Sequence, residues 1–146
     1  MIELDVSPLI KSPASIIDDA ISSTDEHIAA GKDVLVMTSR TLVRGADALS
    51  SLSIGGLVAD ALVKILQGIK VRPRYIVAKG GITSSDAATK GLGIKRAMIV
   101  GQAASGVPLW RCEEESSKFK GIPYVVFPGN VGGNDTLSEL VESWAE

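Results

Sequence analysis

Short apolar runs of strand length alternate along this chain with segments whose apolar residues recur at helical spacing. The strand-length runs are Val34–Met37, Tyr75–Ala78, Ala97–Val100 and Tyr124–Phe127. Helical spacing marks the stretch after Ser12-Pro13, the stretch Leu57–Leu66 and the stretch Thr136–Trp144. This alternation is typical of α/β proteins, in which helices cover a largely parallel sheet. We therefore predict a three-layer α/β fold whose largely parallel sheet is flanked by helices.

Some boundaries of these elements follow from single residues. A serine followed by proline, Ser12-Pro13, predicts a helix start, and Gly68 predicts a helix end. Leu4–Val6 is a short strand candidate, and the uninterrupted apolar run Val34–Met37 predicts a central strand buried on both faces. Pro108 predicts that its strand is an edge strand or has an irregular start.

Length and charge restrict the class of protein. A chain of 146 residues is the size of one domain, and no repeat or low-complexity linker divides it, so we predict a single domain over residues 1–146. A net charge of −2 predicts no general attraction to nucleic acid or to anionic membranes. The chain shows no signal peptide and no apolar run of about 18 residues, the length that spans a bilayer. We expect a cytoplasmic protein.

Residues that often carry chemistry are scarce. The one cysteine, Cys112, excludes an intrachain disulfide and is expected to be a small packed thiol. The one histidine, His27, is expected on a helix surface, and Asp18-Asp19 on a solvated helix face. We predict no metal ligand among these residues.

Glycine and hydroxyl residues gather instead where the predicted strands end. In open α/β sheets, ligands bind beyond the carboxyl ends of the strands. The predicted strand Tyr75–Ala78 leads into Gly80-Gly81-Ile82-Thr83-Ser84, which could admit a nucleotide phosphate or could be an ordinary turn with a helix cap. The glycines of Pro128–Gly133 could pass close under a flat base or a ribose, or could form a turn that leads to a helix cap. In Thr38–Arg40, a hydroxyl and a guanidinium directly follow the strand Val34–Met37; the alternative is that Arg40 is a solvated surface residue. The chain has neither a Walker A loop nor a G-x-G-x-x-G dinucleotide pattern.

The segments Lys79–Gly93 and Tyr124–Gly132 resemble the C-terminal, nucleotide-binding domain of the four-carbon acid sugar kinases. The resemblance extends over most of the chain, from Val34–Arg40 to the final helix. It implies that the chain holds ATP with Mg²⁺. Carried over position by position, the nucleotide contacts of the family fall on Ser39, Gly80, Gly81, Ile82, Thr83 and Gly129.

The resemblance also implies an activity. Members of the family use ATP to phosphorylate short acid sugars such as erythronate, threonate or their oxo forms. The family's acid-sugar site lies mainly in an N-terminal domain with an Asp-Asp-x-Thr-Gly motif, which Asp18–Ser22 does not match. We therefore expect the C-terminal half of a kinase, inactive without the substrate domain, with a catalytic base that this chain does not identify and with homo-oligomers as one possible assembly. The alternative is a non-catalytic module that binds a nucleotide or a phosphorylated metabolite.

Overall fold

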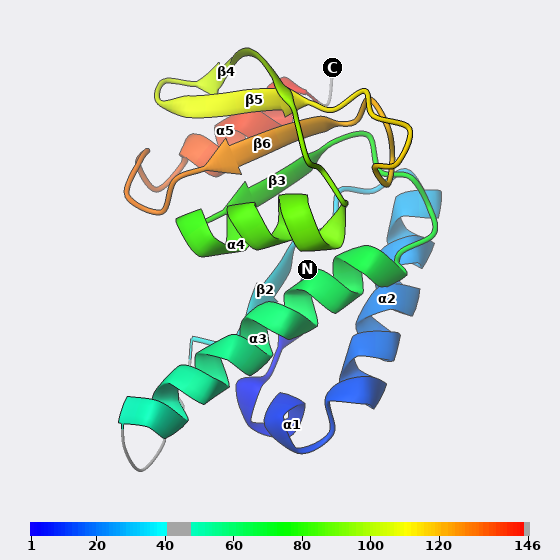
Figure 1. The fold of residues 1–146 in the computed structure, drawn as a ribbon, viewed down its shortest axis with the longest axis vertical. Helices are drawn as coiled ribbons and strands as arrows, with labels where there is room; N and C mark the ends of the chain where they lie inside the picture. The colour runs from blue at the N-terminus through cyan, green and yellow to red at the C-terminus, as the bar shows by residue number, and fades with distance from the viewer. Residues whose placement is uncertain (41–47, 145–146) are drawn as a thin grey trace. The chain divides into compact units, whose positions relative to one another are not determined.

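The computed structural model describes residues 1–40 and 48–144, with side chains on the second segment described from residue 50. These residues divide into two compact units, Met1–Arg72 and Pro73–Glu146, each with its own sheet. The α/β class with sheets flanked by helices is confirmed, while a single domain over residues 1–146 stays a prediction. Figure 1 labels the elements.

Two parallel strands and three helices make up the first unit. The strands pair in parallel with Ile2 opposite Val36, and the helices pack on them around a shared apolar core. The elements are β1 Ile2–Leu4, α1 Val6–Lys11, α2 Pro13–Ala29, β2 Val36–Thr38 and α3 Ala48–Gly68. The buried core residues are Leu4, Leu9, Ile17, Ala20, Ala61 and Ile65.

Local chemistry explains where these helices begin and meet. Asp5, which the sequence placed inside a strand, instead caps α1 by accepting the Ser7 N–H at 3.1 Å. Pro13 occupies the first turn of α2, as predicted. Beyond α3, the Asp25 carboxylate accepts the N–H groups of Lys70 and Val71 at 2.9 Å to 3.0 Å, so α2 holds the chain as it leaves this unit.

The strand β2 corrects one prediction. It begins two residues later than the apolar run Val34–Met37 and pairs with β1 in a two-stranded sheet of described residues. Its three residues are half-buried, and the neighbouring Leu35 is 48% exposed. The prediction of a central strand buried on both faces is therefore wrong for this segment, because an apolar run reports affinity for a core but not the number of neighbouring strands.

One helix has the length and composition of a membrane span. Residues Ser50–Gly68 of α3 are long enough and apolar enough on average to cross a membrane, although they contain no uninterrupted apolar run of that length. Within this stretch, 17% of the residues are buried. The core helix of a soluble protein can have the same length and composition, and α3 carries an ion pair between Asp60 and Lys64 at 2.7 Å. It also packs closely on α2, because a Cβ at Gly68 would overlap the Ile21 side chain.

The second unit is a four-stranded sheet with helices on both faces. The strand order is β3-β6-β5-β4; β3 and β6 are parallel, whereas β5 is antiparallel to both of its neighbours. Figure 1 shows α4 and α5 on opposite sides of this sheet. The elements are β3 Ile76–Lys79, α4 Gly81–Asp86, a π-helical turn η1 Ala87–Gly91, β4 Met98–Ala104, β5 Val107–Arg111, β6 Pro123–Phe127 and α5 Thr136–Ser143.

Successive residues of β6 point to opposite faces and so join both layers. Val125 and Phe127 are buried with Val107 and Leu140 beneath α5. Tyr124, on the other face, is fully buried and hydrogen-bonds to α4. The central position of β6 therefore fixes both helices relative to the sheet.

The strand β4 lies at one edge of this sheet. Met98, Ile99 and Val100 are 69%, 67% and 49% exposed. Pro108 does not mark an edge, because its strand β5 lies between β6 and β4. The alternative prediction, an irregular start, is confirmed, since the register between β4 and β5 shifts next to the pair Gln102 and Pro108.

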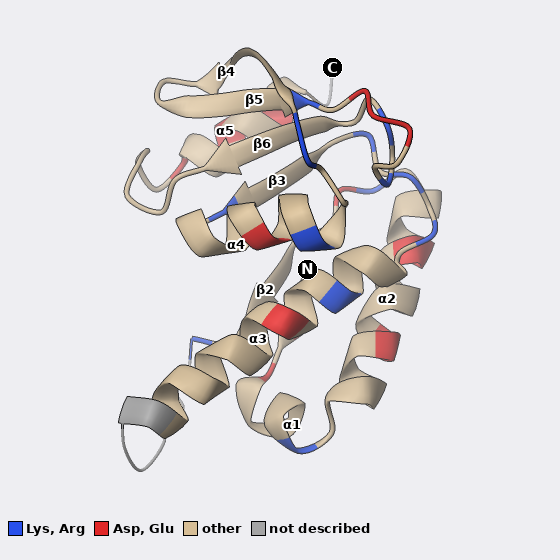
Figure 2. Cartoon of the chain, in the orientation of Figure 1, with Lys and Arg blue, Asp and Glu red and all other residues tan. Residues whose placement is uncertain are grey.

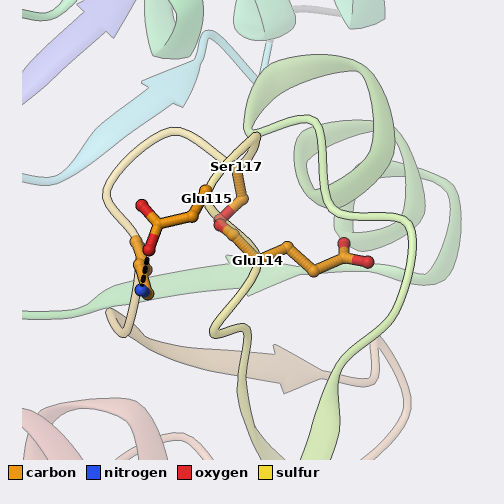
Figure 3. Close-up of polar contacts among 4 residues, drawn as sticks. Glu114, Glu115 and Ser117 are labelled. Carbon is orange, nitrogen blue, oxygen red and sulfur yellow. Dashed lines mark hydrogen bonds and ion pairs between the residues drawn. The ribbon is translucent and has the colours of Figure 1, made fainter.

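An acidic loop after β5 is hydrogen-bonded to the segment that precedes β4. Figure 2 shows acidic residues on this loop and basic residues ahead of β4. The Glu114 carboxylate accepts the backbone N–H groups of Lys95 and Arg96, both at 3.3 Å. Its carbonyl accepts the Ser117 hydroxyl at 2.8 Å, and Figure 3 shows these two residues close together. The neighbouring Cys112 is buried, which agrees with a packed thiol.

Candidate functional site

Two glycine-bearing loops meet at the carboxyl ends of the parallel strands β3 and β6. The last residues of these strands, Lys79 and Phe127, are register partners. The Gly80 N–H donates to the Phe127 carbonyl at 2.8 Å, and a Cβ at Gly129 would lie 3.9 Å from the Gly80 Cα. The structure therefore brings Gly80 and Gly129 together, at the edge of an α/β sheet where ligands bind.

The glycine turn is the start of a helix. Gly80 has a φ of +102°, which a side chain would strain, and α4 begins at the next residue. The Ser84 N–H donates to the Gly80 carbonyl at 2.8 Å. Gly81, Ile82 and Thr83, which the sequence placed in a loop, thus form the first turn of α4. Their N–H groups have no partner four residues earlier within the helix.

Gly81 differs from Gly80 because the fold does not require it to be glycine. Its φ lies outside the left-handed region, and a Cβ built on it would meet nothing within 4 Å. Glycine in a helix costs about 0.5–1 kcal/mol relative to alanine. The side chains that follow are an Ile82 that is 77% exposed and a half-buried Thr83. Packing inside the unit does not explain a glycine here, whereas close approach of a ligand would.

A buried polar network lies behind this turn. The Ser84 hydroxyl donates to the Ala78 carbonyl at 2.6 Å, and the Tyr124 hydroxyl donates to the Ser84 carbonyl at 2.6 Å. Burial raises the pKa of the Tyr124 phenol well above its ordinary value, although the Ala88 backbone N–H, bonded to the phenol oxygen, opposes the shift. The phenol therefore stays protonated at neutral pH and acts as a hydrogen-bond donor.

A positively charged side chain lies at the end of β3. The ammonium group of Lys79 lies 4.1 Å from the centroid of the Phe127 ring, and the Lys79 side chain is exposed. This places one positive charge at the strand end that precedes the glycine turn. The sequence-based site did not include Lys79.

The second glycine pair has a different explanation. Gly132 has a φ of +83°, and its Cβ would lie 2.9 Å from the Thr136 Cβ and Oγ1 atoms. The Gly133 N–H donates to the Thr136 Oγ1 at 2.8 Å. These glycines therefore form the tight entry into α5, which is the turn alternative for this part of the loop.

Ser39 belongs to the first unit. Its N–H donates to the Leu4 carbonyl at 2.8 Å, and its hydroxyl accepts the Val6 N–H at 3.2 Å. It thus joins the end of β2 to the start of α1. The nucleotide contact of Ser39 stays a prediction.

Acidic side chains near the turn do not assemble a metal centre. The Asp86 carboxylate, at the end of α4, pairs with Lys90 at 2.9 Å. Among residues 1–40 and 48–144, no group of three or more His, Cys, Asp or Glu side chains could hold a metal ion. Mg²⁺ is usually bound by one or two carboxylates together with substrate phosphates. The described side chains at the turn do not fit a resident Mg²⁺ ion.

A shallow pocket in the second unit lies away from the glycine turn. Arg74, Tyr75, Leu109, Pro123 and Trp144 line it. Tyr75 directly precedes β3 and Pro123 starts β6, so this pocket is at the amino ends of those strands. The carboxyl ends are the better candidate, because ligand sites of open α/β sheets occur there.

Comparison with known proteins assigns the class. Residues 1–137 match the family described as nucleotide-binding C-terminal domain. A crystal structure of a domain of unknown function (DUF1537) from Bordetella bronchiseptica, a domain-swapped dimer with bound citrate, superposes with a TM-score of 0.66 at 17% identity. The match covers 97% of this chain and 34% of that chain, so this chain spans about a third of its length.

A second crystal form of that protein gives a TM-score of 0.47 at 26% identity, over 76% of this chain and 26% of that chain. No curated protein matches the chain. The family match therefore defines this α/β chain as a nucleotide-binding domain. The chain belongs to the nucleotide-binding C-terminal domain family, and its structural neighbours are DUF1537 proteins.

Sequence reasoning missed the buried residues that support the turn. The sequence places Ser84 in the candidate phosphate loop, but the residue is 3% exposed and its hydroxyl donates to β3. The sequence pattern places Tyr124 in an apolar strand and predicts no further contribution from it. One signal was available: a tyrosine in a buried strand needs a partner for its hydroxyl.

Proposed function

We propose that the turn Gly80–Thr83, together with Gly129, binds the phosphates of ATP. Gly81 carries this proposal, because neither its φ nor its surroundings require glycine in this fold. Without a side chain, the backbone can approach phosphate oxygens, to which the first-turn N–H groups and the Thr83 hydroxyl can donate. Membership of a nucleotide-binding family supports the same assignment.

Neighbouring groups suit the rest of the nucleotide. Lys79 supplies a positive charge near the turn, and the exposed Ile82 side chain offers an apolar surface to a flat base. Mg²⁺ would arrive as part of Mg·ATP, held by the phosphates. Ser39 is proposed as a further contact on the evidence of the family resemblance alone.

The full activity that we propose is ATP-dependent phosphorylation of a four-carbon acid sugar in the cytoplasm. In such reactions the enzyme contributes mainly by positioning the phosphates and neutralising their charge, which the turn would do for the nucleotide. This chain corresponds to about a third of its structural neighbour, so we expect the chain alone to bind ATP without phosphorylating erythronate or threonate. Turnover of either acid by the purified chain would refute this division of labour.

Gly81→Val tests the site. The new side chain has room in the free protein but would occupy the space of the phosphates, so calorimetric titration with Mg·ATP should show affinity reduced about tenfold or more, ~1.4 kcal/mol. Its melting temperature should stay close to that of the wild type. Gly133→Val is the matched control, because Gly133 also lacks a positive φ, and its added Cβ would make an ordinary contact, 3.9 Å from the Thr136 Oγ1, in the other loop.

Two results would contradict the proposal. One is the absence of heat and of thermal stabilisation when the wild-type chain meets millimolar Mg·ATP. Ligand at about 100 times its dissociation constant should stabilise a binding protein by about 2.7 kcal/mol. The other is equal affinity of Gly81→Val and wild type, which would make the turn an ordinary strand-to-helix connection.

A further inference from the structure

The helix that follows the glycine turn changes its winding partway along. Residues Gly81–Asp86 are α-helical, but Ala87–Gly91 form a π-helical turn. The Leu92 N–H donates to the Ala87 carbonyl at 2.9 Å, five residues earlier instead of four. Such π turns are rare, and a side chain inserted into the hydrogen-bond ladder is one recognised cause of helix distortion.

Here the inserted group is the Tyr124 hydroxyl. It donates to the Ser84 carbonyl at 2.6 Å. The same carbonyl also accepts the N–H of Ala87, the first residue of the π-helical turn, so it lies where the winding changes. The tyrosine hydroxyl thus reaches from strand β6 to the point at which the π-helical turn begins.

The same network reaches the glycine turn. Ser84 directly follows Thr83, its N–H donates to the Gly80 carbonyl, and its hydroxyl donates to the Ala78 carbonyl of β3. Ser84 is 3% exposed and Tyr124 is fully buried, so water does not compete for these bonds. The turn is thus attached to the sheet on one side by Gly80 and on the other by Ser84.

We propose that Tyr124 is a positioning residue for nucleotide binding: its hydroxyl, bonded to the Ser84 carbonyl, holds α4 in the winding that aims the Gly80–Thr83 turn at the phosphates. This inference rests on the proposed nucleotide site. Without the hydroxyl, the Ser84 carbonyl loses its bond to β6 and can accept the N–H four residues later, so the helix rewinds toward a regular α form. The first turn then moves relative to Gly129.

Tyr124→Phe removes this hydroxyl and keeps the ring, whose centroid lies 6.1 Å from that of Trp110. We expect its affinity for Mg·ATP, measured by calorimetry well below its melting temperature, to fall about tenfold. The Ala88 and Leu92 amides should also change their hydrogen-exchange protection, because their bonding partners change.

Val107→Ala is the matched control for lost stability. Val107 is fully buried in the cluster beneath α5, on the opposite face of the sheet, so its truncation lowers the melting temperature without touching α4. We expect its affinity for Mg·ATP to stay within about twofold of wild type. Equal losses of affinity in the two variants would overturn the positioning role, as would a Tyr124→Phe variant that binds like wild type.

The outcomes separate this inference from the proposed function. Wild-type binding with unchanged Tyr124→Phe binding overturns the positioning role alone, whereas no saturable binding by the wild type overturns both. If Tyr124→Phe does not fold, Ser84→Ala replaces it, because that change removes only the bond to Ala78. Weakened binding of a folded Ser84→Ala protein supports the network, and unchanged binding overturns it.

Discussion

Two glycine pairs in the second unit follow strands of the same sheet, and they serve different purposes. Gly132 needs to be glycine because of its positive φ and the close Thr136 side chain, and the Gly133 N–H is already used in a bond to that side chain. In the pair Gly80 and Gly81, only Gly80 has a conformational reason, and the Gly81 N–H has no partner within its helix. A glycine pair in a sequence therefore does not indicate a ligand site until the conformational reasons have been subtracted.

The supports of the two turns also differ. The Gly132 turn is held by one threonine that belongs to the helix it starts. The Gly80 turn is held by backbone and side-chain bonds to two strands, through Phe127, Ala78 and Tyr124. These bonds to the sheet hold the Gly80 turn in place without using the first-turn N–H groups that a ligand would need.

The largest expected effect is on folding, at Gly132. Gly132→Ala adds a Cβ at a positive φ and only 2.9 Å from Thr136, so the free energy of unfolding should fall by about 2–4 kcal/mol. Denaturant unfolding measures this loss. Affinity of the folded protein for Mg·ATP should be unchanged, and a selective loss of affinity would mean that both glycine turns contact the nucleotide.

Smaller effects are expected from the two threonines. Thr136→Ala removes the acceptor for the Gly133 N–H and should lower the free energy of unfolding by ~0.5–2 kcal/mol with unchanged affinity. Thr83→Ala should do the reverse, weakening Mg·ATP binding by ~0.5–1.5 kcal/mol at nearly constant stability. Calorimetry and denaturant unfolding of both variants measure these opposite effects on affinity and stability. A loss of stability alone in Thr83→Ala would make Thr83 an ordinary helix cap.

The sequence alone predicted the fold class and the position of the glycine turn. Strands and helices could be located because burial imposes a spacing of two or of 3.6 residues, as around Tyr124–Phe127 and Leu57–Leu66. The start of α4 was misplaced, since Gly80 and Gly81 looked like loop residues although Gly81 is already helical. The order of the strands could not be predicted either, because no local feature of Pro108 or of Val34–Met37 indicates which strands lie beside them.

The sequence predicts candidate site residues only where they follow a recognisable pattern. Glycines after an apolar strand carry a recognisable signature, and the family resemblance added specific positions. The contribution of Tyr124 arises from a contact across 40 residues of chain, between its hydroxyl and Ser84, and no spacing rule encodes it. Long-range hydrogen bonds of this kind become visible only when the register of β3 and β6 is known.

The parallel pairing that builds the glycine turn also sets when that turn can form. Pairing β3 with β6 brings Ile76 to Tyr124, whereas the β4–β5 hairpin closes between Ala104 and Val107. Distant contacts require more loop closure and form more slowly. In pulsed hydrogen exchange during refolding, we expect the hairpin amides to be protected before that of Gly80, which donates to Phe127. A folding chain would then acquire its glycine turn only after the hairpin has already closed.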